Sequence, residues 1–293
     1  MGTVVELRVV AGMQGRLARR GVEHALDAAE AWFVRVEQDC SRFDPASELR
    51  RLCAQPSQVT RVSPLVFRAI QFAVAVAGET EGAFDPTVGA RLEQMGFNRH
   101  HRTGTSSVSG REGGTWRDIR LDADAGTVQL LHPMTLDLGA VAKGLAIDLA
   151  AREMAEQGNF AIDAGGDLYL GGTNGEGDLW SVGIRHPREG ASPIDTVRVS
   201  NLAVCTSGDY ERRTTKGSMH HVVDPRTGDS PSDIVSVTAI GPSAMVADAL
   251  GTAAFVLGAS AGIALFEHPG LEGMVVDRSL TVTTTNGWAS LRA

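Results

Sequence analysis

The segment from Leu136 to Gly166 holds side chains suited to binding an anion. Asp137 and a glycine turn lead into a predicted helix, and Lys143 falls in the first turns of that helix. The first backbone N–H groups of a helix lack intrahelical partners, and the helix dipole is positive at that end. Phosphate groups bind at such N-termini. Asp137, Lys143 and these N–H groups could therefore hold a polyanionic ligand.

A second candidate site lies on the predicted helix that begins after Ser243. Asp248 and Thr252 are four residues apart and so share one face of this helix, whose other residues are mainly apolar. A buried carboxylate needs a partner. A carboxylate and a hydroxyl are hard oxygen ligands that suit Mg²⁺ or Mn²⁺. The alternative is that Asp248 caps a neighbouring element or pairs with an arginine.

A third candidate is the pair His220-His221, which the pattern places on a strand that runs into a turn at Asp224. With Asp224 three residues on, His221 could be oriented as a general base. The alternative is a structural histidine. The chain has no zinc-ligand spacing, no G-x-S-x-G elbow, no Walker A motif and no G-x-G-x-x-G sequence.

The elements that must position these residues follow from periodicity. Helical spacing or capping signals predict helices over residues 17–38, 64–77, 140–157 and 244–257. Alternation predicts strands over 4–10, 233–240 and several between 160 and 204, with a closing hairpin over 274–285. Strands and helices mix without a strict βαβ repeat. The predicted fold class is therefore α+β, with mixed, largely antiparallel sheets and packed helices.

Length and composition limit the function classes. The chain has 293 residues, 43% of them hydrophobic, and a net charge of −8, which argues against nucleic-acid binding. No apolar run approaches the length of a membrane helix. No signal peptide is visible and the three cysteines are odd in number, so we expect free thiols and a cytoplasmic protein. We expect one domain over residues 1–293, or two α+β subdomains, with a variable loop near 98–114.

Taken together, the segments resemble the ApbE family, the FAD:protein FMN transferases, over nearly the whole chain. The resemblance is carried in order by M-G-T at residues 1–3, S-R-F at 41–43 with S-E-L at 47–49, F-D-P-T-V-G at 84–89 with M-G-F at 95–97, D-L-G-A-V-A-K-G at 137–144, A-G-G-D at 164–167, H-V-V-D-P-R-T-G at 221–228 and A-D-A-L-G-T at 247–252. Any one of these motifs is weak, whereas the ordered set is specific.

The resemblance implies the family's activity and fold. Such enzymes take FAD and a target flavoprotein with a D-x-x-T-like motif. The threonine hydroxyl attacks the FMN-side phosphorus of FAD, AMP leaves, and FMN stays on the protein as a phosphoester. Mg²⁺ bridges the pyrophosphate. The implied partners are FAD and the target flavoprotein, with no nucleic acid and no membrane insertion.

The resemblance also implies roles for individual residues. Asp248 and Thr252 would ligate the metal together with the main-chain carbonyl of Ala140. Asp137 and Lys143 would contact FAD. The flavin and adenosine pocket would be lined by Met1, Phe43, Ala83, Phe84 and Asp85, with a main-chain contact from Val222. His221 would accept the threonine proton, and Asp224 would orient it.

The chain departs from the family's usual pattern at two positions. Asp163 stands where asparagine is common before A-G-G-D, and Phe43 stands where tyrosine also occurs, so a phenol hydrogen bond to the flavin is absent. Two other functions use the same residues. One is a Mg²⁺-dependent FAD pyrophosphatase, in which water replaces the threonine hydroxyl. The other is a non-catalytic FAD-binding protein, against which the intact Asp248, Thr252 and His221 argue.

Overall fold

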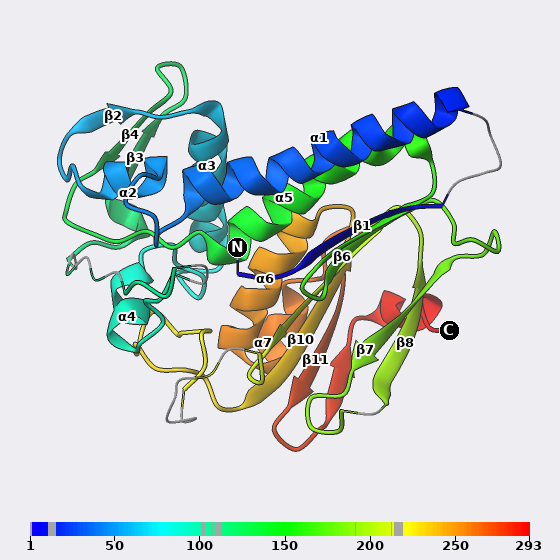
Figure 1. Cartoon of the computed structure of the whole chain (residues 1–293). Helices are drawn as coiled ribbons and strands as arrows, with labels where there is room; N and C mark the ends of the chain where they lie inside the picture. The colour runs from blue at the N-terminus through cyan, green and yellow to red at the C-terminus, as the bar shows by residue number, and fades with distance from the viewer. Residues whose placement is uncertain are drawn as a thin grey trace.

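The fold is built around a large antiparallel sheet with helices on one face (Figure 1). The computed structural model describes residues 2–10, 16–100, 103–106, 108, 110, 113–190, 192–211, 213 and 219–293. Within these residues the sheet has seven strands in the order β1-β5-β6-β9-β10-β11-β12. The strands are β1 Val5–Val9, β5 Phe160–Ala164, β6 Asp167–Gly171, β9 Leu202–Gly208, β10 Ile234–Gly241, β11 Glu272–Asp277 and β12 Val282–Thr284.

Two smaller sheets accompany the large one. β2 (Val59–Arg61), β3 (Ile119–Asp122) and β4 (Thr127–Leu130) form a three-stranded sheet in the order β2-β4-β3. β7 (Trp180–Arg185) pairs with β8 (Pro193–Val199) as a separate hairpin. Every pairing between these strands in the described part of the chain is antiparallel, which confirms the predicted α+β class.

The helices lie mainly on one face of the large sheet and around the small one (Figure 1). They are α1 Arg16–Cys40, α2 Glu48–Cys53, α3 Pro64–Glu79, α4 Gly89–Gln94, α5 Gly139–Met154, α6 Ala244–Leu257 and α7 Ala259–Ala264, with short 3₁₀ segments at Trp116–Asp118, Ala155–Gln157 and Asn286–Ser290. Ser63 begins α3 with proline next to it, and Ser243 begins α6, as the sequence predicted.

The centre of the large sheet is buried on both faces. Along β9, Ala203 and Cys205 face the helices, whereas Val204 faces the β7–β8 hairpin. All eight residues of β10 are buried, which explains why its sequence, I-V-S-V-T-A-I-G, is mainly apolar rather than alternating. The helices on one face and the hairpin on the other therefore hold the sheet as a rigid support for the loops at its ends.

Part of the predicted variable loop lies outside the described residues, namely 101, 102, 107, 109, 111 and 112. Its described part contains a single antiparallel bridge between Arg99 and Ser106. No helix in the described part of the chain is long and apolar enough to cross a membrane. The three cysteines are free and buried.

Candidate active site

The antiparallel packing of α5 against α6 places the predicted phosphate-binding and metal-binding residues side by side. A Cβ atom at Gly144 would lie 2.4 Å from Met245 Cα and 2.5 Å from Ala244 O, so the two helix backbones touch at this point. One residue earlier on α5, Lys143 Nζ lies 3.6 Å from Asp248 Oδ2 on α6. Along this register the first turn of α5, which contains Ala140, runs beside the part of α6 that bears Asp248 and Thr252.

Lys143 lies between two carboxylates. Its ammonium forms an ion pair with Asp167 Oδ2 and faces Asp248, and both carboxylate residues are buried. Asp167 also accepts a hydrogen bond of 3.1 Å from the backbone N–H of Thr206. Burial alone would lower the pKa of Lys143, but the charges of Asp248 and Asp167 outweigh it and hold that pKa above its ordinary value. The site therefore contains a permanent positive charge, with 23% of the Lys143 side chain exposed to a ligand.

Asp167 was not among the predicted site residues, although it belongs to the A-G-G-D motif. The turn before it requires glycine, because Gly165 and Gly166 have φ angles of +68° and +94°. A Cβ atom at Gly165 would lie 1.9 Å from Thr3 Oγ1, so the start of the chain crosses over this turn. The M-G-T motif is thus brought beside A-G-G-D; Met1 itself lies outside the described residues.

Arg42 joins three of the sequence motifs. It is buried, and its guanidinium donates to the Asp137 carboxylate and to the main-chain oxygen of Phe97, the latter at 2.5 Å. The same group lies 4.0 Å from the centre of the Phe43 ring. Sequence reasoning placed Arg42 in a motif but gave it no role, since an arginine in a short loop carries no signal for its distant partners.

Asp137 is held at the start of α5 by these contacts. Its Oδ1 accepts from Gly139 N at 2.7 Å, and Oδ2 is paired with Arg42. Its backbone N–H donates to Pro86 O at 2.7 Å, which ties the start of α5 to the 84–89 turn. Asp137 therefore shapes the helix start, and its predicted contact with FAD stays a prediction.

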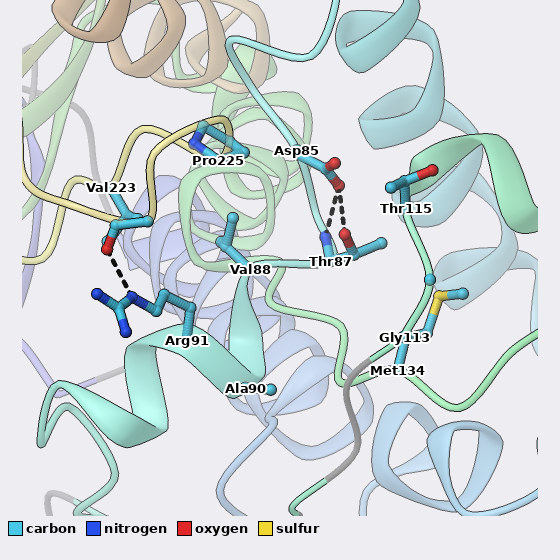
Figure 2. A pocket seen from close by; sticks show the side chains of 12 residues that line it. Asp85, Thr87, Val88, Ala90, Arg91, Gly113, Thr115, Met134, Val223 and Pro225 are labelled. Atoms are coloured by element: carbon cyan, nitrogen blue, oxygen red, sulfur yellow. Dashed lines mark hydrogen bonds between the residues drawn. The ribbon is translucent and has the colours of Figure 1, made fainter.

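A pocket of about 200 Å³ lies between the 84–89 turn and the 223–228 turn (Figure 2). Its lining residues are Asp85, Thr87, Val88, Ala90, Arg91, Gly113, Gly114, Thr115, Met134, Val223, Pro225 and Gly228. Arg91 Nε donates to Gly228 O at 2.5 Å and so fixes one wall against the other. Two motifs that are far apart in the sequence thus form a single concave site, as ligand binding requires.

Asp85 is the predicted ligand contact that lines this pocket. Its Oδ1 accepts from the backbone N–H and the hydroxyl of Thr87, both at 2.8 Å, as Figure 2 shows. Burial raises the pKa of Asp85, although the hydrogen bonds from Thr87 and Trp116 oppose this effect. The side chains of Ala83 and Phe84 are instead packed in the core, so only their main-chain atoms are left for a ligand.

Among the described residues 219–224, the strand predicted to deliver the histidines is not formed. His220 forms only an isolated bridge with Arg213, and its backbone N–H donates to Ser230 Oγ at 3.1 Å instead of extending a ladder. Its ring is buried, contacts Phe255 edge-on, and donates from Nε2 to Pro231 O at 2.8 Å. His220 therefore takes the structural role that was the alternative reading for this pair.

His221 and Val222 follow directly, with the Val222 side chain in the core and the next residue lining the pocket. The carboxylate of Asp224 is engaged by Arg226, which donates from Nε at 2.9 Å and from Nη2 at 2.8 Å. This pair lowers the pKa of Asp224. The roles of His221 as a base and of Asp224 as the group that orients it stay predictions.

The predicted metal ligands fit a hard divalent cation. Asp248 supplies a buried carboxylate, Thr252 a hydroxyl one helical turn away, and Ala140 a main-chain carbonyl on the adjacent helix. The described residues contain no cluster of three or more His, Cys, Asp or Glu side chains placed for a metal. A set with one carboxylate therefore suits Mg²⁺, which keeps waters and phosphate oxygens as further ligands, better than it suits zinc.

The chain resembles known proteins over most of its length. The model of the ApbE family matches residues 1–275. The FAD:protein FMN transferase of Treponema pallidum is 31% identical, with 94% of this chain and 82% of that protein aligned. The enzyme of the same name from Vibrio cholerae is 30% identical over 79% of this chain and 73% of its own length. The crystal structure of the ApbE protein from Thermotoga maritima superimposes with a TM-score of 0.82 at 28% identity, covering 98% of this chain and 96% of that one.

Proposed function

Because the chain belongs to the ApbE family, we propose that it is an FAD:protein FMN transferase, which moves FMN from FAD to a hydroxyl of a target flavoprotein. The observation that supports this most directly is the convergence of the motifs. Contacts of Arg42, Arg91 and Lys143 join segments between residues 41 and 248 into one site. The acceptor we propose is a threonine in a D-x-x-T-like motif, and the product is a phosphoester.

The reaction forms one P–O bond and breaks another. The threonine oxygen bonds to the FMN-side phosphorus, the bond from that phosphorus to the bridging oxygen breaks, and AMP leaves with the bridging oxygen. The threonine proton goes to His221, our candidate base. A neutral hydroxyl is a poor nucleophile, so removing this proton is the step for which the chain must supply a group.

Negative charge gathers on the leaving phosphate as the bond breaks. Lys143 supplies a fixed ammonium, and the N-terminus of α5 supplies the positive end of its dipole. Mg²⁺ bound by Asp248, Thr252 and the Ala140 carbonyl would neutralise further charge on the pyrophosphate oxygens. The pocket beside Asp85 offers a volume of about 200 Å³ for part of the dinucleotide.

Intact-mass measurement tests the proposal. The purified chain is mixed with FAD, Mg²⁺ and a fusion peptide carrying a D-g-x-T-x-a-T motif. We expect the peptide to gain the mass of one FMN residue, the gain to vanish with chelator, and a peptide with alanine in place of the acceptor threonine to stay unmodified. An Asp248→Asn variant is the matched control for the metal site and should give no adduct.

The other two functions are distinct outcomes of the same experiment. Free FMN and AMP with an unmodified peptide would show a pyrophosphatase. FAD that stays intact with the wild-type chain would show a binding protein.

A further inference from the structure

Asp148 lies on α5, outside every motif assigned to substrate or metal, yet its carboxylate is fully engaged by the start of α6. Oδ2 accepts from the hydroxyl of Ser243 at 2.6 Å and from the backbone N–H of Met245 at 3.1 Å. Oδ1 accepts from the N–H of Ala244 at 2.7 Å. Ser243 is itself the N-cap of α6 and accepts from Val246 N. The side chains of Asp148 and Ser243 thus accept hydrogen bonds from the first three N–H groups of α6. Ser243 lies directly before α6, whereas Asp148 belongs to a different helix, α5.

This cap fixes how α5 and α6 slide along one another. Asp148 and Gly144 are one helical turn apart on the same face of α5. Gly144 sets the separation of the helices, because the backbone of Ala244 and Met245 leaves no room for a Cβ atom there. Asp148 sets the axial position, because its oxygens meet donors only where α6 begins. A carboxylate is also favoured at this end by the helix dipole.

The candidate catalytic groups lie on the same two helices, close to the cap. Lys143 is five residues from Asp148, or about 7.5 Å along α5, and Asp248 is four residues from Ala244, or about 6 Å along α6. The Lys143–Asp248 separation of 3.6 Å therefore depends directly on the register that the cap holds. Sliding one helix by a single residue would move these groups by about 1.5 Å.

We infer that Asp148 is a positioning residue of the active site: by capping α6 from α5, it sets the register that aligns Lys143 and Ala140 with Asp248 and Thr252. This inference rests on the proposed function for its catalytic consequence. The cap itself does not depend on that function, since its hydrogen bonds are a property of the folded chain.

The test compares Asp148→Asn with Ser63→Ala. Asparagine keeps the shape of the side chain but replaces one acceptor oxygen with an N–H₂ group that faces the donors of α6. Ser63 caps α3 through Val66 N, so its removal is a matched loss of a helix cap on an element that carries no predicted site residue. Ser243→Ala, which removes one of the three hydrogen bonds to Asp148, serves if the Asp148 variant does not fold.

Two readouts are taken at a temperature where each variant is folded. Amide hydrogen exchange over residues 244–252 needs no turnover, and we expect it to accelerate by about tenfold in Asp148→Asn. For FMN transfer, we expect kcat to fall by about 10²-fold, the scale of a 1 Å misplacement, while KM for FAD changes little. Ser63→Ala should lose thermal stability and keep its kcat.

Each outcome decides the inference. Unchanged kcat in folded Asp148→Asn, or an equal loss of kcat in Ser63→Ala, would overturn the positioning role. If the wild-type chain transfers no FMN, the proposed function fails separately. Exchange over 244–252 then decides whether Asp148 holds the register, and unchanged exchange would overturn it.

Discussion

Replacing Gly144 with alanine should push α5 away from α6 and misalign the site. The new Cβ atom would lie 2.4 Å from Met245 Cα and 2.5 Å from both Ala244 O and Met245 N. These are backbone atoms, which cannot rotate aside, so reaching ordinary contact requires the helices to separate by roughly 1 Å. Overpacking of this kind costs about 1–3 kcal/mol of the free energy of unfolding. A shift of this size at Lys143 and Asp248 should lower FMN transfer by about 10²-fold.

Gly21→Ala is the matched control. Gly21 is also helical, but a Cβ atom there meets nothing within 4 Å. Both variants gain about 1 kcal/mol from the higher helix propensity of alanine. The difference between their unfolding free energies in urea therefore isolates the helix–helix clash, and we expect Gly144→Ala to be the less stable by about 1–3 kcal/mol.

The assay pairs urea unfolding with the intact-mass rate of FMN transfer. Gly21→Ala should be slightly stabilised and fully active. The reasoning would be refuted if Gly144→Ala were as stable and as active as Gly21→Ala, because the two helix backbones would then not be in contact.

Four further outcomes are expected. Lys143→Met should lower the free energy of unfolding by about 3–5 kcal/mol, because Asp167 and Asp248 would be left buried without their cation; an unchanged urea midpoint would contradict the ion-pair assignment. Burial lowers the pKa of His220 below its ordinary value of 6.5, so as the pH falls the unfolded chain takes up this proton first. The free energy of unfolding should therefore decrease below about pH 6.5, and less steeply in His220→Gln than in the wild-type chain. If urea unfolding at several pH values gave the same pH dependence for both proteins, His220 would be excluded as the cause. His221→Ala should bind FAD normally by equilibrium dialysis but transfer FMN about 10²-fold more slowly, the scale for loss of a general base; normal transfer would remove His221 from that role. The three cysteine thiols, which are buried, should react with a thiol reagent such as DTNB only after unfolding, and rapid labelling of the folded chain would show that one is accessible.

Local sequence patterns were enough to predict most of the individual elements. Ser63 with Pro64 predicted the start of α3, and Ser243 with Gly258 predicted both ends of α6. Capping hydrogen bonds join residues two or three apart, so the chemistry that begins a helix is written in adjacent letters. The α+β class followed from the same local periodicities.

Local reasoning failed where a segment's partners are distant. Residues 220–224 were predicted to continue a strand, yet in the described part of this segment His220 forms only a bridge with Arg213, and its backbone N–H bonds to Ser230 instead. The spacing of Asp224 also gave no sign of Arg226, which the structure shows bound to its carboxylate, and the role of Asp224 toward His221 stays a prediction. A spacing indicates which residues lie near each other along the chain, but not which rotamer brings two polar groups into contact.

The sequence by itself determined the chemistry that this chain can do: hard oxygen ligands one helical turn apart, a lysine near a helix start, and ordered motifs that identify a family. Only the tertiary structure decided which of these groups meet. The pairing of Lys143 with Asp167, the burial of Arg42 against Asp137, and the cap from Asp148 to α6 join residues 24, 95 and 96 positions apart, respectively. Such contacts depend on the register of packed helices and on the turn at Gly165, which are set by close backbone approach across the whole fold.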